Sequence, residues 1–531
     1  MTSDVRDYEA ALQTIGSLIF SRTRADGSSW QEDFNTVHTC VKHLGLEEDL
    51  PKMSVIHVAG TKGKGSTCAF VESIMRTAGC STGLFTSPHL VDIRERFRFN
   101  GKPCSQETFT KHFWVVWDKL QAAATPEAPM PTYFRFLTLL GLHMFIHEKV
   151  QVVILEVGLG GRWDATNVVP APVVCGVTSL GYDHVELLGH TLALIAGEKA
   201  GIFKPNVPAF TSPQDPEAME SLERRANELQ IPLTVVSPLN MLFNKLDPAS
   251  GSDHLTLGLA GSHQRLNAAL AITLCRTYAQ RVPNPPPALA AGEEMFTEQG
   301  MLPACYVEGL QTCTWPGRAQ VLHDDEVLEG QGSLTFYLDG AHTEESMVEC
   351  ARWWAESVMP SESSEKQEPG EGGPMATQRF MLFNCTMERD PNKLMKPLAA
   401  MVKERNLAFA RAIFVPPDSS TNIKPTSGDK DTRWQQKLRH TWQTITQTDG
   451  TSGKQDTAGG GSSPSQTNDA NDANSSSDTA TTAVIPSMHK SIEWFREQAR
   501  ARPAVRTQVL VTGSLYLVGD MLRIIRRGVP L

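Results

Sequence analysis

The sequence predicts an α/β fold of two domains, each built on a mainly parallel sheet. Short apolar runs rich in β-branched residues alternate with longer stretches of helical spacing, which is typical of parallel sheets covered by helices. The chain has 531 residues, more than a single hydrophobic core usually holds together. Polar and glycine-rich motifs follow several of the apolar runs, at the strand ends where such sheets place their sites.

The first half of the chain supplies three of these strands and two helices. Met53–Ala59, Val152–Val157 and Val173–Thr178 are apolar and β-branched, as suits central strands that are buried on both faces. Ser66–Gly79 is predicted to be a helix that ends on glycine. Arg135–Lys149 has apolar residues at helical spacing and is predicted to be a second helix.

The second half repeats the strand signal and is interrupted twice. Leu334–Leu338, Arg379–Asn384 and Gln508–Thr512 are further predicted strands. Residues 360–377 and 446–483 are polar, without periodic apolar residues, and such segments bury too little surface to offset their chain entropy. We interpret both as loop insertions and the longer one as disordered. Each is alternatively a partner-binding or phosphorylation segment.

Composition excludes several classes of protein. The net charge of −10 argues against a general nucleic-acid binder, which needs clustered Lys and Arg. No apolar run approaches the roughly 20 residues that cross a bilayer. The acidic N-terminus resembles neither a secretory signal nor a transit peptide. The ten cysteines form no CxxC pair, which favours reduced, buried thiols and a cytoplasmic protein, with zinc or disulfides as the alternative.

The sharpest motif is the glycine-rich loop GTKGKGST, residues 60–67, after the first predicted strand. Small residues let backbone N–H groups close around phosphate oxygens, the following helix points its positive end at them, and Lys64 adds charge. The spacing is not that of the standard P-loop, and an ordinary helix-capping turn is the alternative. The run Gly158–Gly161 lacks the third glycine of a dinucleotide fingerprint, so it does not indicate NAD.

Three other strand ends carry candidate metal ligands. Ser87 offers a hydroxyl, Glu156 a carboxylate at the end of a buried strand, and His184 follows Asp183. Mg²⁺ prefers hard oxygen ligands, so Ser87 and Glu156 suit it better than His184 does. Taken singly, Ser87 is equally a helix cap, Glu156 a loop anchor and His184 a structural hydrogen bonder.

The chain resembles the folylpolyglutamate synthase branch of the Mur ligase superfamily. The resemblance is carried, in this order, by GTKGKGST, TSPHL, YFRFLTLL, EVGLGGRWDATN, SLGYDH, GEKAGIFK, LAGSHQRLNAALA, WPGRAQ, LDGAH, NCTMERD and VTGSLYLVGD. It runs from about residue 30 to the C-terminus, and its YFRFLTLL stretch and long insertion indicate a eukaryotic, fungal member. It implies an N-terminal P-loop ATPase domain, residues 1–308, and a C-terminal Rossmann-like ligase domain, residues 309–531.

By this resemblance, the first domain holds the nucleotide and the metal. ATP would be bound by Thr61, Gly63, Lys64, Gly65, Ser66 and Asn267. Mg²⁺ would be held by Ser87, Glu156 and His184. Lys199 matches a lysine that is N-carboxylated in relatives and would then serve a second Mg²⁺, whereas the alternative is an unmodified amine paired with an acid.

The resemblance also assigns residues to the second domain. Arg318 and Asp339 would reach ATP, and Asp339, His342 and Ser514 would lie near the glutamate pocket. The expected catalytic residues are then Lys64, Lys199, Asp339 and His342. The alternatives are a salt bridge for Arg318, a helix N-cap for Asp339 and a packed ring for His342.

Two departures from the family pattern stand out. Lys62 replaces an asparagine found in many relatives, which affects the charge of the loop. The stretch Asn384–Asp390 lacks a glycine often present there, which leaves the shape of that loop open.

The implied activity is the ATP-dependent ligation of L-glutamate to the γ-carboxylate of tetrahydrofolate and folylpolyglutamates, a tetrahydrofolate synthase reaction that retains folates for one-carbon metabolism. It proceeds through an acyl phosphate and uses Mg²⁺, with K⁺ as a further expected ion. We expect a monomer whose partners are folate, glutamate and ATP, and a mitochondrial form from another start site stays open. The alternatives are a dihydrofolate synthase or bifunctional enzyme, a cell-wall Mur ligase, and a non-catalytic nucleotide-binding regulator.

Overall fold

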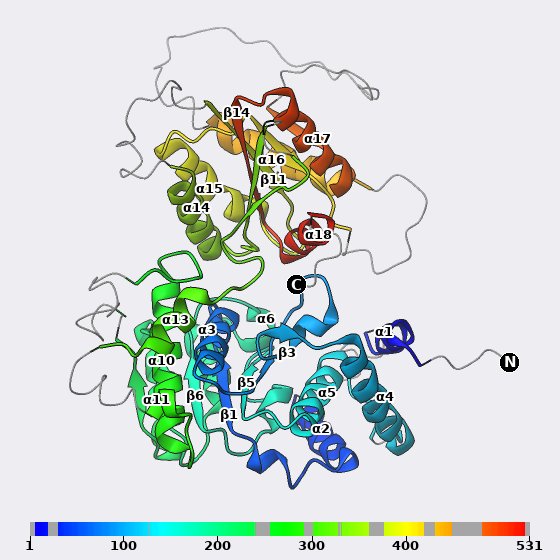
Figure 1. Cartoon of the computed structure of the whole chain (residues 1–531), viewed down its shortest axis with the longest axis vertical. Helices are drawn as coiled ribbons and strands as arrows, with labels where there is room; N and C mark the ends of the chain where they lie inside the picture. The colour runs from blue at the N-terminus through cyan, green and yellow to red at the C-terminus, as the bar shows by residue number, and fades with distance from the viewer. Residues whose placement is uncertain are drawn as a thin grey trace, which may run out of the picture. The chain divides into compact units, whose positions relative to one another are not determined.

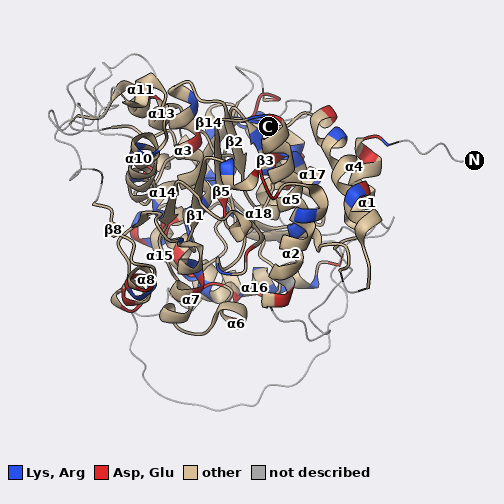
Figure 2. Ribbon diagram, turned by 90° about the horizontal axis from the view of Figure 1, so that it is seen from below, with Lys and Arg blue, Asp and Glu red and all other residues tan. Residues whose placement is uncertain are grey.

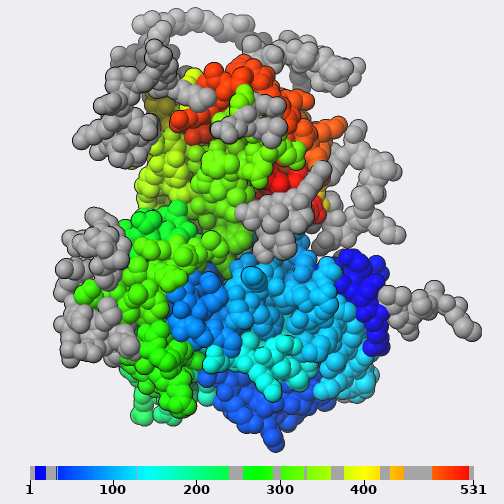
Figure 3. All heavy atoms as spheres, in the orientation of Figure 1, coloured from blue at the N-terminus to red at the C-terminus, as the bar shows by residue number. Residues whose placement is uncertain are grey.

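The computed structural model divides the chain into two units, Met1–Trp315 and Pro316–Pro530. The residues it describes are 6–19, 30–126, 128–237, 239, 255–290, 301–327, 330, 332–359, 376–418, 431–448 and 481–525. The boundary predicted after residue 308 falls inside α13 (Ala304–Thr312), a helix of the first unit. In Figure 3 the first unit carries the colours from blue to green and the second those from green to red.

The first unit is built on an eight-stranded sheet of order β4-β3-β2-β5-β1-β6-β7-β8. Its strands are β1 (Val55–Ala59), β2 (Thr82–Phe85), β3 (Phe97–Phe99), β4 (Lys102–Pro103), β5 (Val152–Glu156), β6 (Val174–Val177), β7 (Ala209–Thr211) and β8 (Leu233–Val235). All pairs are parallel except those of the edge strands β3 and β4. The carboxyl ends of β1, β2, β5 and β6 therefore meet at one edge of the sheet.

Helices cover both faces of this sheet, and side-chain alternation along the strands decides which core each residue joins. Ile56 and Val58 of β1 pack with α3, α10 and α13, whereas Val55 packs with α1, α2, α4 and α5 on the opposite face. Figure 1 shows α3 and α10 across the sheet from α5 and α2. The helices are α1 (Tyr8–Gly16), α2 (Trp30–Leu44), α3 (Lys64–Thr77), α4 (Gln106–Ala123), α5 (Tyr133–His147), α6 (Val185–Leu188), α7 (Leu192–Lys199), α8 (Pro216–Leu229), α10 (Gln264–Arg281), α11 (Pro287–Ala290) and α13.

The second unit holds a six-stranded sheet of order β13-β12-β11-β14-β10-β9, parallel except for the edge strand β9. Its strands are β9 (Gln320–His323), β10 (Ser333–Leu338), β11 (Ala376–Phe383), β12 (Arg411–Phe414), β13 (Thr482–Val484) and β14 (Val505–Thr512). Its helices are α14 (Glu344–Val358), α15 (Pro391–Glu404), α16 (Arg433–Thr448), α17 (Met488–Ala501) and α18 (Leu515–Ile525). One core lies under α14, α15 and α16, and Phe336 and Phe380 meet Phe495 of α17 on the other face.

The α/β fold with mainly parallel sheets is confirmed, as are the predicted strands and helices, with shifted ends. The predicted insertions, residues 360–377 and 446–483, lie mostly outside the described residues. Where their ends are described they are ordered: β11 begins at Ala376, α16 continues to Thr448, and Thr482 opens β13.

No helix in the described ranges is long and apolar enough to cross a membrane. Figure 2 shows Lys and Arg interspersed with Asp and Glu on the helices, as along α8.

Candidate functional site

The glycine-rich loop connects β1 to α3, and two of its glycines are required by the space around them. Gly60 has φ 146°, and a Cβ there would lie 1.8 Å from Thr178 Oγ1. Gly63 has φ 85° directly before α3, and a Cβ there would lie 2.2 Å from Asn267 Oδ1. A side chain at either position is therefore excluded both by the backbone conformation and by a neighbouring atom.

Backbone hydrogen bonds tie this loop to the segment after β6. The N–H groups of Thr61 and Lys62 both donate to the Ser179 carbonyl at 3.1 Å. Thr61 Oγ1 donates to the Gly181 carbonyl and accepts from its N–H, each at 3.2 Å. The loop is thus held in shape by the segment that follows a second strand.

The first turn of α3 brings the predicted phosphate-binding residues together with α10. Lys64 Nζ donates to the Thr61 carbonyl at 3.4 Å, so its amine lies over the loop. Ser66 Oγ accepts from Gln264 Nε2 at 3.4 Å, and Asn267 Nδ2 donates to Gln264 Oε1 at 2.9 Å. The positive helix end and the Lys64 amine face the same loop, which favours binding of a phosphate chain.

Glu156 lies beside this turn. It ends β5, it is 4% exposed, and its Oε2 accepts from the Ser87 N–H at 2.9 Å. A Cβ on Gly65 would lie 3.6 Å from both Glu156 carboxylate oxygens. Two oxygen donors of the kind that Mg²⁺ prefers, the Glu156 carboxylate and the Ser87 hydroxyl, therefore come from neighbouring residues next to the phosphate loop.

His184 is placed differently from the other predicted metal ligands. It has φ 51° at the start of α6, its side chain is half exposed, and its Nε2 lies 3.8 Å from Asp183 Oδ2. The described residues contain no group of three or more His, Cys, Asp or Glu arranged to hold a metal. A metal at this edge would therefore rely on a hydroxyl, water or phosphate oxygens besides Glu156.

Lys199 is a buried amine at the end of α7. It is 5% exposed, and its Nζ donates to the Gly60 carbonyl at 2.7 Å. Burial, aided by the positive charge of Lys64, lowers the pKa of Lys199 to about 7. A large fraction of the amine is therefore neutral at neutral pH, which is the nucleophilic form.

The run Gly158–Gly161 has a packing role that the sequence did not disclose. A Cβ on Gly161 would lie 2.8 Å from the Glu198 carbonyl oxygen and 2.9 Å from that of Lys199. The glycine lets this loop lie directly on the backbone that carries Lys199.

A series of buried hydrogen bonds through Asp164, Thr166 and His57 holds the same loop. These bonds were not predicted from the sequence. Asp164 Oδ2 accepts from the N–H groups of Gly158 and Leu159 at 3.1 and 3.0 Å. Its Oδ1 accepts from the Thr166 hydroxyl, and Thr166 Oγ1 lies 2.9 Å from His57 Nε2. Because the only Thr166 hydroxyl proton goes to Asp164, His57 Nε2–H is the donor of the last bond. The motif WDATN contains Asp164 and Thr166, and it was the sequence feature that could have indicated these bonds.

In the second unit, Asp339 organises the end of β10. Its Oδ2 accepts from the Ala319 N–H at 2.8 Å and its Oδ1 from the Ala341 N–H at 2.9 Å. A Cβ on Gly340 would lie 2.9 Å from Arg318 Nη1, and His342 Nδ1 lies 2.8 Å from the Gly340 carbonyl oxygen. The three predicted residues Arg318, Asp339 and His342 thus surround one glycine.

Ser514 lies at the neighbouring strand end. It follows β14, the partner of β10, and is 3% exposed; its Oγ accepts from the Tyr516 N–H at 3.2 Å as α18 begins. The preceding Gly513 has φ 101°, and a Cβ there would lie 2.4 Å from the Asn384 carbonyl oxygen. The loop whose shape the sequence left open is held from α16, because Trp434 Nε1 donates to the Cys385 carbonyl at 2.7 Å.

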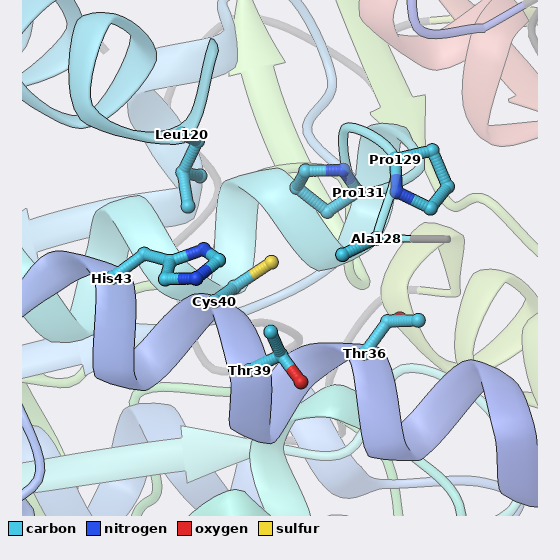
Figure 4. Close-up of a pocket in the computed structure, with 8 residues that line it drawn as sticks. All are labelled: Thr36, Thr39, Cys40, His43, Leu120, Ala128, Pro129 and Pro131. Atoms are coloured by element: carbon cyan, nitrogen blue, oxygen red, sulfur yellow. The ribbon is translucent and has the colours of Figure 1, made fainter. Parts of the chain in front are cut away.

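Two further observations concern residues outside this site. All ten cysteines are free and nine are buried, so the predicted thiols are confirmed. Figure 4 shows a small hollow between α2, α4 and residues 128–131, where His43 and Cys40 lie near Leu120 and Pro131. None of its lining residues belongs to the predicted site.

Comparison with known proteins decides the family. A folylpolyglutamate synthase of Arabidopsis thaliana is 45% identical over 540 residues, covering 98% of this chain and 88% of its own. The chain belongs to the folylpolyglutamate synthase family. A mitochondrial folylpolyglutamate synthase of Homo sapiens is 40% identical over 428 residues, covering 77% of this chain and 68% of its own. No family model matches the chain.

Solved structures of this family share the fold. The Mycobacterium tuberculosis folylpolyglutamate synthase complexed with ADP and AMPPCP has a TM-score of 0.68 at 21% identity, covering 99% of this chain and 100% of its own. An FPGS–AMPPCP–folate complex has a TM-score of 0.62 at 21% identity, covering 98% and 100%. Both similarities extend over the two units, so the two-domain architecture is common to the family.

Proposed function

We propose that this chain ligates L-glutamate to the γ-carboxylate of tetrahydrofolate and of folylpolyglutamates, with hydrolysis of ATP to ADP and phosphate. The observation that carries the proposal is the phosphate loop, in which Lys64 and the positive end of α3 stand beside the buried carboxylate of Glu156. The relatives named folylpolyglutamate synthase supply the substrate class, and the solved complexes with AMPPCP and folate agree with it.

The reaction needs activation because oxide is a very poor leaving group from a carboxylate. The γ-carboxylate oxygen attacks the γ-phosphorus of ATP, giving an acyl phosphate and ADP. The glutamate amine then attacks the acyl carbon, phosphate leaves, and the amine loses a proton. The protein's part is to position the reactants and neutralise charge, which we assign to Lys64 and, from the second unit, to Arg318.

Mg²⁺ fits the donors at the edge of the first sheet. Glu156 and Ser87 would hold it with His184, and the ion would neutralise charge on the phosphates. K⁺ is a further proposed ion without a described ligand set.

Lys199 is proposed to be N-carboxylated. Its neutral amine, favoured by the lowered pKa, would add to CO₂ and release a proton, giving a carbamate. This converts the buried amine into an anion beside the Lys64 cation, which replaces the like-charge repulsion of the protonated amine by an attraction and adds an oxygen ligand for a metal. The measurement is ¹³C NMR of protein equilibrated with ¹³CO₂, with Lys199→Arg as the control. A carbamate resonance of equal intensity in both proteins would count against Lys199.

In the second unit, Asp339, His342 and Ser514 are proposed to bind glutamate and to orient its amine. The imidazole of His342 is suited to accept the amine proton near pH 7. A monomer is also proposed. A cytosolic location is proposed because free thiols suit a reducing compartment, and a mitochondrial form is proposed because relatives include mitochondrial forms.

The decisive assay measures ADP release with Mg-ATP and glutamate, offering tetrahydrofolate and dihydropteroate separately and identifying products by mass. We expect glutamate to be added to tetrahydrofolate. Product from dihydropteroate as well would make the enzyme bifunctional. Lys64→Ala should abolish ligation without unfolding the protein, and near-normal activity in that variant would refute the assignment of the loop.

A further inference from the structure

Arg98 of β3 is a buried cation of the first unit to which no role has been assigned above. Its side chain belongs to a residue that is only 8% exposed. It lies opposite Leu84 in the antiparallel pair of β3 with β2, and residues paired in this way share one face of the sheet. Leu84 packs with the core under α3, so Arg98 is on the α3 face, level with the residue before the end of β2.

The guanidinium of Arg98 lies over an indole that reaches the phosphate loop. Arg98 Cζ is 4.8 Å from the centre of the Trp315 ring. The indole Nε1 is 3.3 Å from the position of a Cβ on Gly65, and both Glu156 carboxylate oxygens are 3.6 Å from the same position. These residues all belong to the first unit. One indole ring therefore connects Arg98 to the first turn of α3.

Two carboxylates act on the charge of Arg98, and both are engaged elsewhere. Glu95 accepts from the backbone N–H groups of residues 90–92 at 2.6 to 2.8 Å. Glu72 Oε1 accepts from Thr82 Oγ1 at 2.7 Å. Among the described residues, neither carboxylate forms an ion pair with Arg98, and Arg98 Nε has no hydrogen-bond partner.

A buried guanidinium in this state is suited to bind an anion. Burial lowers the pKa of Arg98 because the charged form loses its hydration. Buried charges are normally paired with an opposite charge for the same reason. A guanidinium that lies over an aromatic ring uses its face for that contact, and its N–H donors stay in its own plane. Those donors match the two oxygens of a carboxylate.

The acid substrate of the proposed function carries an anion of this kind. The γ-carboxylate of the glutamyl residue to be extended must reach the γ-phosphorus of ATP at the phosphate loop. Its α-carboxylate is three carbon atoms away, at most about 5 Å. The phosphate chain is assigned to Lys64 and the positive end of α3, whereas no cation of the first unit has been assigned to the α-carboxylate.

We propose that Arg98 binds the α-carboxylate of the glutamyl residue that is being extended, with Trp315 supporting the guanidinium from its face. The proposal rests on the proposed function and makes Arg98 a specificity-determining residue. The enzyme then favours acids that carry a second carboxylate close to the one that is activated. Dihydropteroate has no glutamyl residue and gains nothing from Arg98.

The first test uses the wild-type protein with two acids. One is tetrahydrofolate, and the other is the analogue in which 4-aminobutyrate replaces the glutamyl residue, which keeps the carboxylate to be activated and lacks the α-carboxylate. We expect kcat/KM for the analogue to be lower on the order of 10- to 100-fold, the usual value of hydrogen bonds between charged groups. Equal kcat/KM for the two acids would overturn the proposal, and this result does not depend on the folding of any variant.

The second test removes the charge with Arg98→Met, which keeps an unbranched apolar stem. The KM for tetrahydrofolate should rise on the order of 10- to 100-fold, while the KM for ATP stays within about threefold because the phosphate loop is untouched. The kcat/KM for the 4-aminobutyrate analogue should stay within about threefold of the wild-type value, because that acid has no group for Arg98 to bind. Arg98→Lys should recover only part of the KM, because an ammonium keeps the charge but not the planar fork.

The outcomes separate this role from the alternatives. Equal losses with both acids would mean that Arg98 is structural, and a loss confined to ATP would mean that it binds phosphate; either result overturns the proposal. Arg411→Met is the matched control, since Arg411 Cζ lies 5.2 Å from the Trp494 ring centre in the second unit, and its KM for tetrahydrofolate should equal that of the wild type. A wild-type protein that ligates glutamate to neither acid would instead count against the proposed function.

Discussion

The two units build their strand-end sites by different means. In the first unit the site is shaped by missing side chains: Gly60, Gly63 and Gly65 leave room for Thr178, Asn267 and Trp315. In the second unit Gly340 and Gly513 also leave room for their neighbours, but a side chain fixes the frame, because both carboxylate oxygens of Asp339 hold backbone N–H groups of the surrounding loops.

The difference follows from what each loop must do. A phosphate chain is held by converging backbone N–H groups, so the loop around it must approach closely and tolerates no Cβ. In the proposed function the amino acid is recognised by individual side chains, those of His342 and Ser514, and these need a fixed frame. Substitutions should therefore abolish function in the first unit by adding atoms and in the second by removing them.

Gly63→Ala should have the largest effect. The new Cβ lies 2.2 Å from Asn267 Oδ1 at φ 85°, so the loop or α10 must move. Misplacement of the phosphate cradle by this amount should lower kcat/KM for ATP by at least about 100-fold. Steady-state kinetics and ADP binding by calorimetry would measure this loss.

Gly79→Ala separates backbone strain from the clash. Gly79 has φ 92°, but a Cβ there meets nothing within 4 Å. It should cost about 1–2 kcal/mol of stability and leave ATP kinetics unchanged. Equal kinetic losses in the two variants would show that the clash with Asn267 is not the cause.

Asp339→Asn should have the next largest effect. The amide can accept only one of the two N–H bonds, and its own NH₂ then faces the other N–H group. Leaving one partly buried donor unsatisfied costs about 1–3 kcal/mol. We expect a lower melting temperature together with a higher KM for glutamate.

Asp390→Asn is the control for Asp339→Asn. Asp390 caps α15 with a single bond to the Asn392 N–H, and asparagine caps helices about as well as aspartate does. Stability and kinetics should both stay close to wild type. A KM for glutamate that is unchanged in Asp339→Asn would remove Asp339 from the proposed glutamate site.

The sequence predicted what depends on short-range chemistry. The apolar run that ends on Glu156 predicted β5 and marked the buried carboxylate at its end as a candidate, since a carboxylate at the end of a buried strand is costly unless it has a partner. The start of α3 was placed two residues late, at Ser66, because the helix begins after Gly63 in a left-handed conformation and lacks a side-chain cap. The resemblance to a family added the residues of the second unit, which no spacing rule supplies.

What the sequence could not give are contacts made by residues far apart in the chain. The bond between His57 and Thr166 spans 109 positions, and the contact of Trp315 with Gly65 joins opposite ends of the first unit. The unit to which α13 belongs also depends on such a contact. Gly309 lets α13 lie against Ile74 of α3, so α13 belongs to the first unit. The apolar pattern of α13 alone does not show which helix it packs against.

Acidification should weaken the first unit more than the second through two buried histidines. Burial lowers the pKa of His57 to about 3, and burial with the nearby charges of His147 and His112 lowers that of His143 to about 3. Their unfolded pKa is about 6.5. Between these values the unfolded state binds more protons, so stability is complete above pH 6.5 and falls as the pH drops towards 3, by about 1.4 kcal/mol per pH unit for each histidine.

Urea unfolding between pH 4 and 8 tests this pH dependence in the wild type, His57→Gln and His143→Gln. Each variant should lose about 1.4 kcal/mol per pH unit of the acid-side slope and should match the wild-type slope above pH 6.5. A slope below pH 6.5 that is the same in all three proteins would show that other groups control acid stability.

The smallest effect is expected from Lys62→Asn, which restores the residue that many relatives carry. The Lys62 N–H helps to shape the loop through its bond to the Ser179 carbonyl, and asparagine keeps that bond. The lost charge is partly exposed and screened by solvent, so the KM for ATP should rise only about two- to fivefold. The increase should shrink as salt is raised, because screening reduces the contribution of an exposed charge.

Lys52→Asn, which removes an exposed lysine paired with Asp49, is the matched control and should leave KM unchanged. An increase in KM beyond tenfold that is insensitive to salt would instead place Lys62 in direct contact with the phosphates and make the first site depend on a side chain as the second one does.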